Sequence, residues 1–172
     1  MLEIKGLTKK YKNADKNAIE DINLTIENGD IYGFIGPNGA GKSTTIKCLV
    51  GIHSFEKGSI MLDGLSIKDN PIEFKHQISY VPDNPDLYEF LTGMEYINFV
   101  SNVYDEDVSK EDIINLAKKF NLENNLLEPI RTYSHGMKQK IALIAALAHN
   151  PKVLIMDEPF VGLDPKAVYD MK

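Results

Sequence analysis

The stretch that decides the fold is Gly36-Pro37-Asn38-Gly39-Ala40-Gly41-Lys42-Ser43, in which two glycines enclose four residues and Lys-Ser follows. The apolar run 31–35 before it predicts a short buried strand, and residues 44–50 after it predict a helix that ends at Gly51. In this context, glycines allow successive backbone N–H groups to point inward, and the helix N-terminus adds partial positive charge. The sequence therefore predicts a loop that binds an anion of the phosphate type.

The same stretch fits the Walker A pattern of proteins that bind nucleoside triphosphates. Lys42 is expected to reach the β- and γ-phosphates, and the Ser43 hydroxyl is expected to ligate Mg²⁺. The residues expected to surround the phosphates are Gly36, Pro37, Asn38, Gly39, Ala40, Gly41, Lys42, Ser43 and Thr44. A glycine turn beside an ordinary helix cap is the alternative, and it leaves the Lys-Ser pair at this offset unexplained.

Composition narrows the class of protein. The chain has 172 residues, of which 43% are hydrophobic and 26% charged, as expected for one globular domain with a subdomain. A net charge of -6 argues against general affinity for nucleic acid. The single cysteine, Cys48, excludes an internal disulfide. The longest apolar run, 141–148, is shorter than the roughly 20 residues that a bilayer requires, so any membrane connection is expected through a partner.

Hydrophobic periodicity predicts a mixed α/β architecture. Apolar residues in 2–7 and alternating ones in 19–26 predict an antiparallel β layer, with a turn at 28–30. From about residue 83 the pattern becomes helical. Helices are expected at 71–77, 92–103, from 109 and at 136–148, and further short strands at 59–62, 78–81 and 153–156. We therefore expect a core formed by 1–82 and 150–172, with a helical subdomain at 83–149.

A second motif follows the helical region. Four apolar residues, 153–156, precede Asp157-Glu158, which is the Walker B arrangement. Asp157 is expected to hold Mg²⁺, and Glu158 to act as general base on the attacking water. Strands often end in acidic residues, so this motif alone is weak evidence for a metal site. Its position after the phosphate loop makes the prediction strong.

A third stretch, Tyr133-Ser134-His135-Gly136-Met137, resembles the Leu-Ser-Gly-Gly-Gln signature of ABC ATPases. Ser134 and Gly136 match the signature, whereas the other three residues depart from it, as in bacterial exporter-type subunits. Ser134 is expected to cap a helix whose first N–H groups face an anion. The alternative is that Ser134 only caps a core helix.

The resemblance to ABC ATP-binding domains covers nearly the whole chain and implies a P-loop NTPase, RecA-like core with an N-terminal antiparallel β layer and a helical insertion. It implies that Tyr11 stacks on adenine, although a surface tyrosine in a polar loop is a serious alternative. Asp83 stands where the family has the Q-loop glutamine, and it is expected near Mg²⁺. Residues 162–164, Gly-Leu-Asp, match the D-loop at the family's dimer interface.

The function implied is that of the ATP-binding and ATP-hydrolysing subunit of an ABC transporter. Two such domains would close head-to-tail on two ATP molecules, each held between Walker A of one copy and the signature of the other. Membrane-spanning permease subunits are the further partners, which implies a cytoplasmic, peripheral location on the inner face of the membrane. Docking is expected near 83–96, where the apolar residues are Leu87, Tyr88, Phe90 and Leu91. Packing of these residues beneath the helical insertion is an equal alternative.

Two other functions stay open. One is a soluble ABC ATPase without transport, although the insertion is too short for the coiled coil of the repair members. The other is a nucleotide-binding fragment without turnover, because the chain stops at Lys172, before the family's switch histidine. On this interpretation the domain is C-terminally truncated. No Asn-Lys-x-Asp motif is present, which argues against a GTPase.

Overall fold

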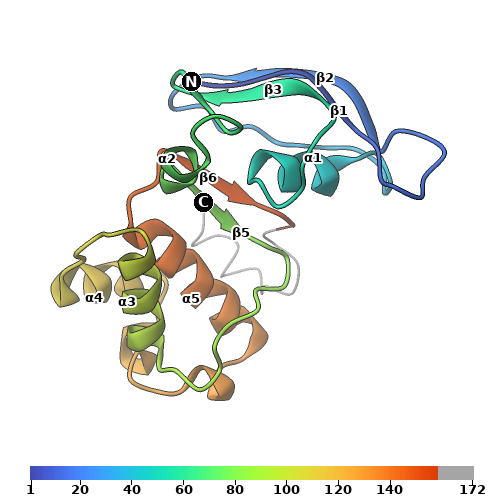
Figure 1. Ribbon diagram of the computed structural model, residues 1–172. Helices are drawn as coiled ribbons and strands as arrows, with labels where there is room; N and C mark the ends of the chain where they lie inside the picture. The colour runs from blue at the N-terminus through green and yellow to red at the C-terminus, as the bar shows by residue number, and fades with distance from the viewer. Residues whose placement is uncertain (159–172) are drawn as a thin grey trace. The chain divides into compact units, whose positions relative to one another are not determined.

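The computed structural model describes residues 1–158, which include one compact unit at Met1–Ile78 and most of a second that begins at Ser79 (Figure 1). Each unit has its own secondary structure and its own buried side chains. The expected division into a core of 1–82 with 150–172 and a helical part at 83–149 stays a prediction.

The first unit is built on a four-stranded sheet. Its strands are β1 (Leu2–Lys9), β2 (Ile19–Ile26), β3 (Lys57–Leu62) and β4 (Leu65–Ser66), in the order β2-β1-β3-β4. All neighbouring strands are antiparallel, and Leu2 lies opposite Ile26 on one side and Leu62 on the other. Leu2 and Ile4 are buried because alternate residues of β1 face the same side, and Leu7 is buried after a register shift between Ile4 and Leu7. The antiparallel layer predicted from the sequence is confirmed.

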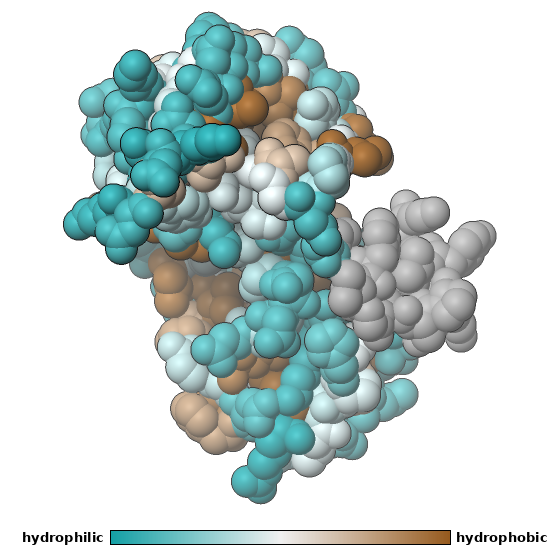
Figure 2. Space-filling model, turned by 90° about the vertical axis from the view of Figure 1, so that its right-hand side faces the viewer, coloured by the Kyte–Doolittle hydropathy of each residue, from teal (hydrophilic) through white to brown (hydrophobic). Residues whose placement is uncertain are grey.

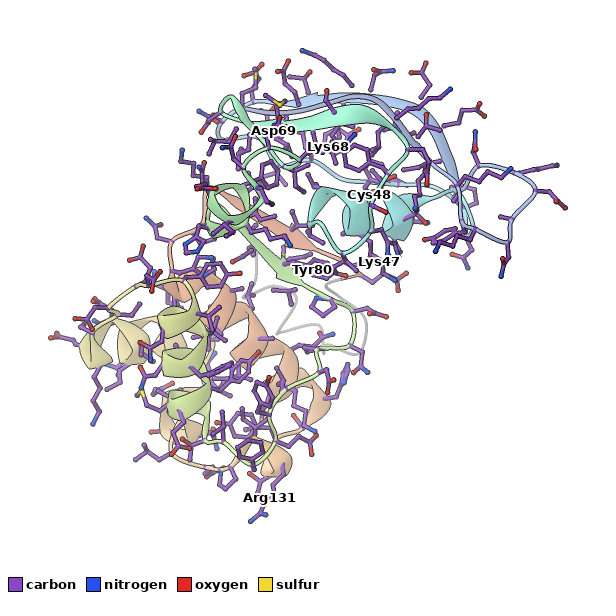
Figure 3. All side chains as sticks on the ribbon, viewed as in Figure 1. Lys47, Cys48, Lys68, Asp69, Tyr80 and Arg131 are labelled. Atoms are coloured by element: carbon purple, nitrogen blue, oxygen red, sulfur yellow. The ribbon has the colours of Figure 1, made fainter. Side chains whose placement is uncertain are left out.

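Two helices complete this unit, α1 (Lys42–Leu49) and α2 (Pro71–His76). Figure 3 shows Cys48 on the side of α1 that faces the sheet and Lys47 on the opposite side. Cys48 is completely buried, and burial raises the pKa of its thiol. Cys48 is therefore a structural side chain.

The strand predicted at 31–35 is wrong. No strand is assigned there, and Ile31 and Ile35 are 101% and 96% exposed. The apolar run predicts burial, but a strand is stable only where a neighbour accepts and donates its backbone hydrogen bonds. The sheet of the first unit does not include this segment, so Ile31, Tyr32 and Ile35 stay exposed.

The second unit contains a two-stranded sheet and a group of helices. The sheet pairs β5 (Ile78–Val81) with β6 (Val153–Met156), both as predicted. The helices α3 (Gly93–Val103) and α4 (Lys110–Lys119) pack on α5 (His135–Ala148). Two short 3₁₀ helices, η1 (Glu123–Asn125) and η2 (Ile130–Thr132), were not predicted. The core of this unit includes Ile97, Ile113, Ile141 and Ile144, all almost completely buried.

Side-chain caps set the starts of the three long helices. Thr92 and Glu95 form a reciprocal capping box at α3, and Ser109 caps α4 by accepting from the Asp112 N–H. Ser134 caps α5 as predicted. These caps satisfy backbone donors that have no partner within the helix.

The face of the molecule shown in Figure 2 is mostly hydrophilic, with smaller hydrophobic areas. Among residues 1–158, no helix combines the length and the hydropathy needed to cross a bilayer.

Candidate functional site

The predicted phosphate loop lies directly before α1 in the first unit. Gly41 is the N-cap residue, in the left-handed conformation with φ 89°, and no side chain caps the helix. A Cβ at Gly41 would lie 2.3 Å from Ile19 Cγ2 and 2.8 Å from the Ala18 carbonyl oxygen. Only glycine fits there. The first N–H groups of α1, beginning with that of Lys42, are therefore available to an anion.

The Lys42 side chain folds back over the loop. Its ammonium group donates hydrogen bonds to the carbonyl oxygens of Gly36, at 2.7 Å, and Pro37, at 2.9 Å. The charge is thus held beside the free N–H groups at the helix N-terminus. A phosphate bound there would exchange neutral carbonyl acceptors for charged oxygens, which form stronger hydrogen bonds with an ammonium group.

The structure places Tyr11 beside this loop. Its hydroxyl lies 3.3 Å from Thr44 Oγ1, and its ring meets the His53 ring edge to face at 5.6 Å between centroids. Tyr11 is 39% exposed, so part of the ring remains open to solvent. This position agrees with a role beside the bound nucleotide, which stays a proposal.

An ion pair beneath Tyr11 was missed from the sequence. Lys9 is 9% exposed, and its ammonium lies 3.1 Å from Glu56 Oε1. The Lys10 backbone N–H donates a hydrogen bond to the Glu56 carboxylate and lowers its pKa most. The Lys9 ammonium lowers the same pKa further. No sequence pattern connects residue 9 with residue 56, because β1 and β3 meet only through the sheet register.

In the second unit, the predicted metal-binding carboxylates lie at one end of the two-stranded sheet. The Asp157 N–H donates to the Val81 carbonyl at 3.0 Å, so the C-terminal ends of β5 and β6 are adjacent. Burial raises the pKa of Tyr80, and the charges of Asp157 and Asp83 raise it further. Both carboxylates therefore act on the same phenol.

Asp157 and Asp83 offer carboxylate oxygens, the kind of ligand that Mg²⁺ takes in proteins. Asp157 is half-buried, whereas Asp83 and Glu158 are exposed. Among residues 1–158, no group of three or more His, Cys, Asp or Glu side chains is placed to hold a metal. Mg²⁺ usually keeps several waters and uses one or two carboxylates plus phosphate oxygens. The residues present fit Mg²⁺ that arrives with a nucleotide.

The signature stretch lies at the N-terminus of the 14-residue helix α5. Ser134 is exposed and its Oγ accepts from the Met137 N–H at 3.3 Å, while Tyr133 is buried and donates to the Asn125 carbonyl at 2.6 Å. Tyr133, which replaces the leucine of the signature, therefore packs in the core. Ser134 is exposed at the start of this helix, whereas Gly136, in its first turn, is half-buried. The predicted D-loop at 162–164 lies outside the described residues.

Two contacts hold the segment after β5 against α5. Gln139 donates to the Asp83 carbonyl at 2.8 Å, and Lys138 forms an ion pair with Glu89. Gln139 is only 6% exposed. This segment is therefore tied to the helix that carries the signature stretch.

The sequence profile described as ABC transporter matches residues 19–161. The chain belongs to the ABC transporter family. An uncharacterized ABC transporter ATP-binding protein, YhcH of Bacillus subtilis (strain 168), is 38% identical over 173 residues, which cover 100% of this chain and 55% of that protein. The chain thus spans about half the length of this relative.

Solved structures of ABC proteins share the fold. An ATP-binding subunit of an ABC transporter is 35% identical, with a TM-score of 0.89 over 99% of this chain and 71% of that one. A dimeric ATP-binding cassette in a post-hydrolysis state, bound to ADP and Pi, is 25% identical, with a TM-score of 0.84 over 99% of this chain and 79% of that one. The ABC chain therefore has the α/β fold of the P-loop NTPases, as predicted.

Proposed function

We propose that this chain binds ATP with Mg²⁺ and hydrolyses it as the ATP-binding subunit of an ABC transporter. The observation that carries the proposal is the uncapped N-terminus of α1, with the Lys42 ammonium held beside it by two loop carbonyls. Backbone N–H groups and an ammonium at a helix start bind phosphate oxygens through charge and direct hydrogen bonds.

Each predicted residue has a role in this proposal. The cradle for the triphosphate comprises residues 36–44, in which Lys42 stabilises charge on the γ-phosphate during transfer. Ser43 and Asp157 hold Mg²⁺, with Asp83 near it, and Glu158 accepts the proton of the attacking water. Tyr11 contacts the adenine.

The second ATP-binding domain is the first partner. Ser134 is the exposed N-cap of the 14-residue helix α5, and Gly136 lies half-buried in its first turn. A helix start of this length attracts anions. In the proposed dimer, this end of one copy completes the phosphate site of the other. The similar cassette bound to ADP and Pi is dimeric, which supports the pairing of two copies.

Membrane-spanning permease subunits are the other proposed partners. The structure separates the apolar residues expected to dock: Leu87 is 8% exposed and packs in the core, whereas Tyr88 and Phe90 are 50% and 76% exposed. Tyr88 also contacts the rings of Phe90 and Phe99, so these aromatic side chains form a surface on the segment tied to α5 and on α3. We propose docking there, which would place the protein on the cytoplasmic face of the membrane.

The mass of the protein in solution tests the shared site. With Mg²⁺ and a non-hydrolysable ATP analogue, we expect light scattering to show a doubling of mass, because each nucleotide joins two copies. AMP, which lacks the phosphates that the signature contacts, is the control and leaves the mass unchanged. An unchanged mass at saturating analogue would contradict the proposed dimer.

A further inference from the structure

Tyr11 is held by three side chains of the first unit. Its hydroxyl reaches Thr44 Oγ1 at 3.3 Å, its ring is perpendicular to the His53 ring at 89°, and the Lys9 ammonium lies 5.7 Å from its centroid. Edge-to-face ring pairs and cation–π contacts both restrict where the ring can lie. Tyr11 itself follows the end of β1 and is in neither a helix nor a strand. Its orientation therefore depends on these side chains.

His53 is itself fixed to the helix that follows the phosphate loop. Its backbone N–H donates to the Lys47 carbonyl at 3.0 Å, and the Ile52 N–H donates to the same oxygen at 2.9 Å. The imidazole is half-buried. His53 thus lies in the bend after α1, fixed to the last turn of this helix, and Thr44 lies in its first turn. The helix and the bend that follows it therefore present two contacts to Tyr11.

We propose that His53 is a positioning residue for the nucleotide base, and that it acts by holding the Tyr11 ring in place. This inference rests on the proposed function, because it assumes that ATP occupies the loop and that Tyr11 contacts adenine. A ring that is already oriented loses less conformational freedom when a base stacks on it. His53 therefore contributes to affinity for the base and not to affinity for the phosphates.

Binding of the phosphate chain and binding of the base can be measured separately, which distinguishes a positioning role of His53 from a structural one. Tripolyphosphate offers the phosphate chain alone, whereas ATP adds the base. Loss of the His53 ring should weaken the affinity for ATP by about threefold to tenfold, the size expected for one aromatic pair. The affinity for tripolyphosphate should stay unchanged. A variant that disturbed the loop or the fold would bind both ligands more weakly.

Calorimetric titration with Mg-ATP and with Mg-tripolyphosphate tests the proposal on the purified chain. The variants are His53→Ala, His53→Phe, which keeps an aromatic edge, and Ser54→Ala, a control at the exposed neighbouring position. We expect His53→Ala to weaken ATP alone, and His53→Phe and Ser54→Ala to bind both ligands within about twofold of wild type.

Four results would overturn the inference. ATP affinity unchanged in His53→Ala would show that His53 does not position the base. An equal loss for both ligands, or no rescue by His53→Phe, would assign His53 a role in folding or a polar contact. If the unsubstituted chain bound neither ligand, the proposed function would fail first, and this inference would fail with it.

Discussion

Lys42→Ala is expected to abolish measurable ATP binding. The substitution removes the ammonium that the Gly36 and Pro37 carbonyls hold beside the helix start. Hydrogen bonds to charged groups contribute about 1.5–3 kcal/mol each, so loss of those to the β- and γ-phosphates corresponds to a factor of about 100 or more in the dissociation constant. Calorimetric titration with Mg-ATP measures this directly.

Lys47→Ala is the matched control for this experiment. Lys47 lies on the same helix, on the side away from the sheet, and forms the last turn together with Cys48 (Figure 3). Its loss removes the same charge from α1 without touching the loop, so ATP affinity should stay within about threefold of wild type. If Lys42→Ala retained wild-type affinity, the phosphate-loop assignment would be wrong.

A Glu158→Gln protein should still bind ATP, but its ATP hydrolysis should nearly stop. The amide has the shape of the carboxylate but cannot accept the proton of the attacking water. General-base catalysis contributes roughly 10²–10⁴-fold, so we expect phosphate release to fall by a factor of about 100 or more. Affinity for ATP should not fall, because the phosphates are held by the loop before α1.

Phosphate release under saturating ATP gives the rate, and titration gives the affinity. Glu106→Gln, at an exposed carboxylate beyond α3, removes one negative charge elsewhere and should leave the rate unchanged. A Glu158→Gln protein with the wild-type rate would remove Glu158 as the base, while the binding role of the loop would stand.

Local sequence signals predicted local structure well. The strands at 19–26, 78–81 and 153–156 have the predicted bounds, and Ser134 caps α5 as expected. Alternation and capping act over a few residues, so they can be seen in the sequence. The failure at 31–35 has the opposite cause, because a strand depends on a neighbour that is distant in the chain.

The candidate site was predictable where a motif is contiguous. The residues proposed for the phosphate loop are contiguous, so one motif gives all of them, and the left-handed conformation of Gly41 agrees with a glycine at that position. The contacts of Tyr11 with His53 and of Lys9 with Glu56 were not predictable, because each joins residues more than 40 positions apart. The segment after β5 shows the same limit: composition alone could not separate buried Leu87 from exposed Phe90.

The central claim is that the loop before α1 binds the phosphates of ATP. Titration of the unsubstituted chain with ATP and with AMP, both with Mg²⁺, tests it most directly, since the two share the base, the sugar and the α-phosphate. The account predicts that ATP binds at least about tenfold more tightly, because Lys42 and the helix start act on the β- and γ-phosphates. Equal affinity for ATP and AMP would contradict it.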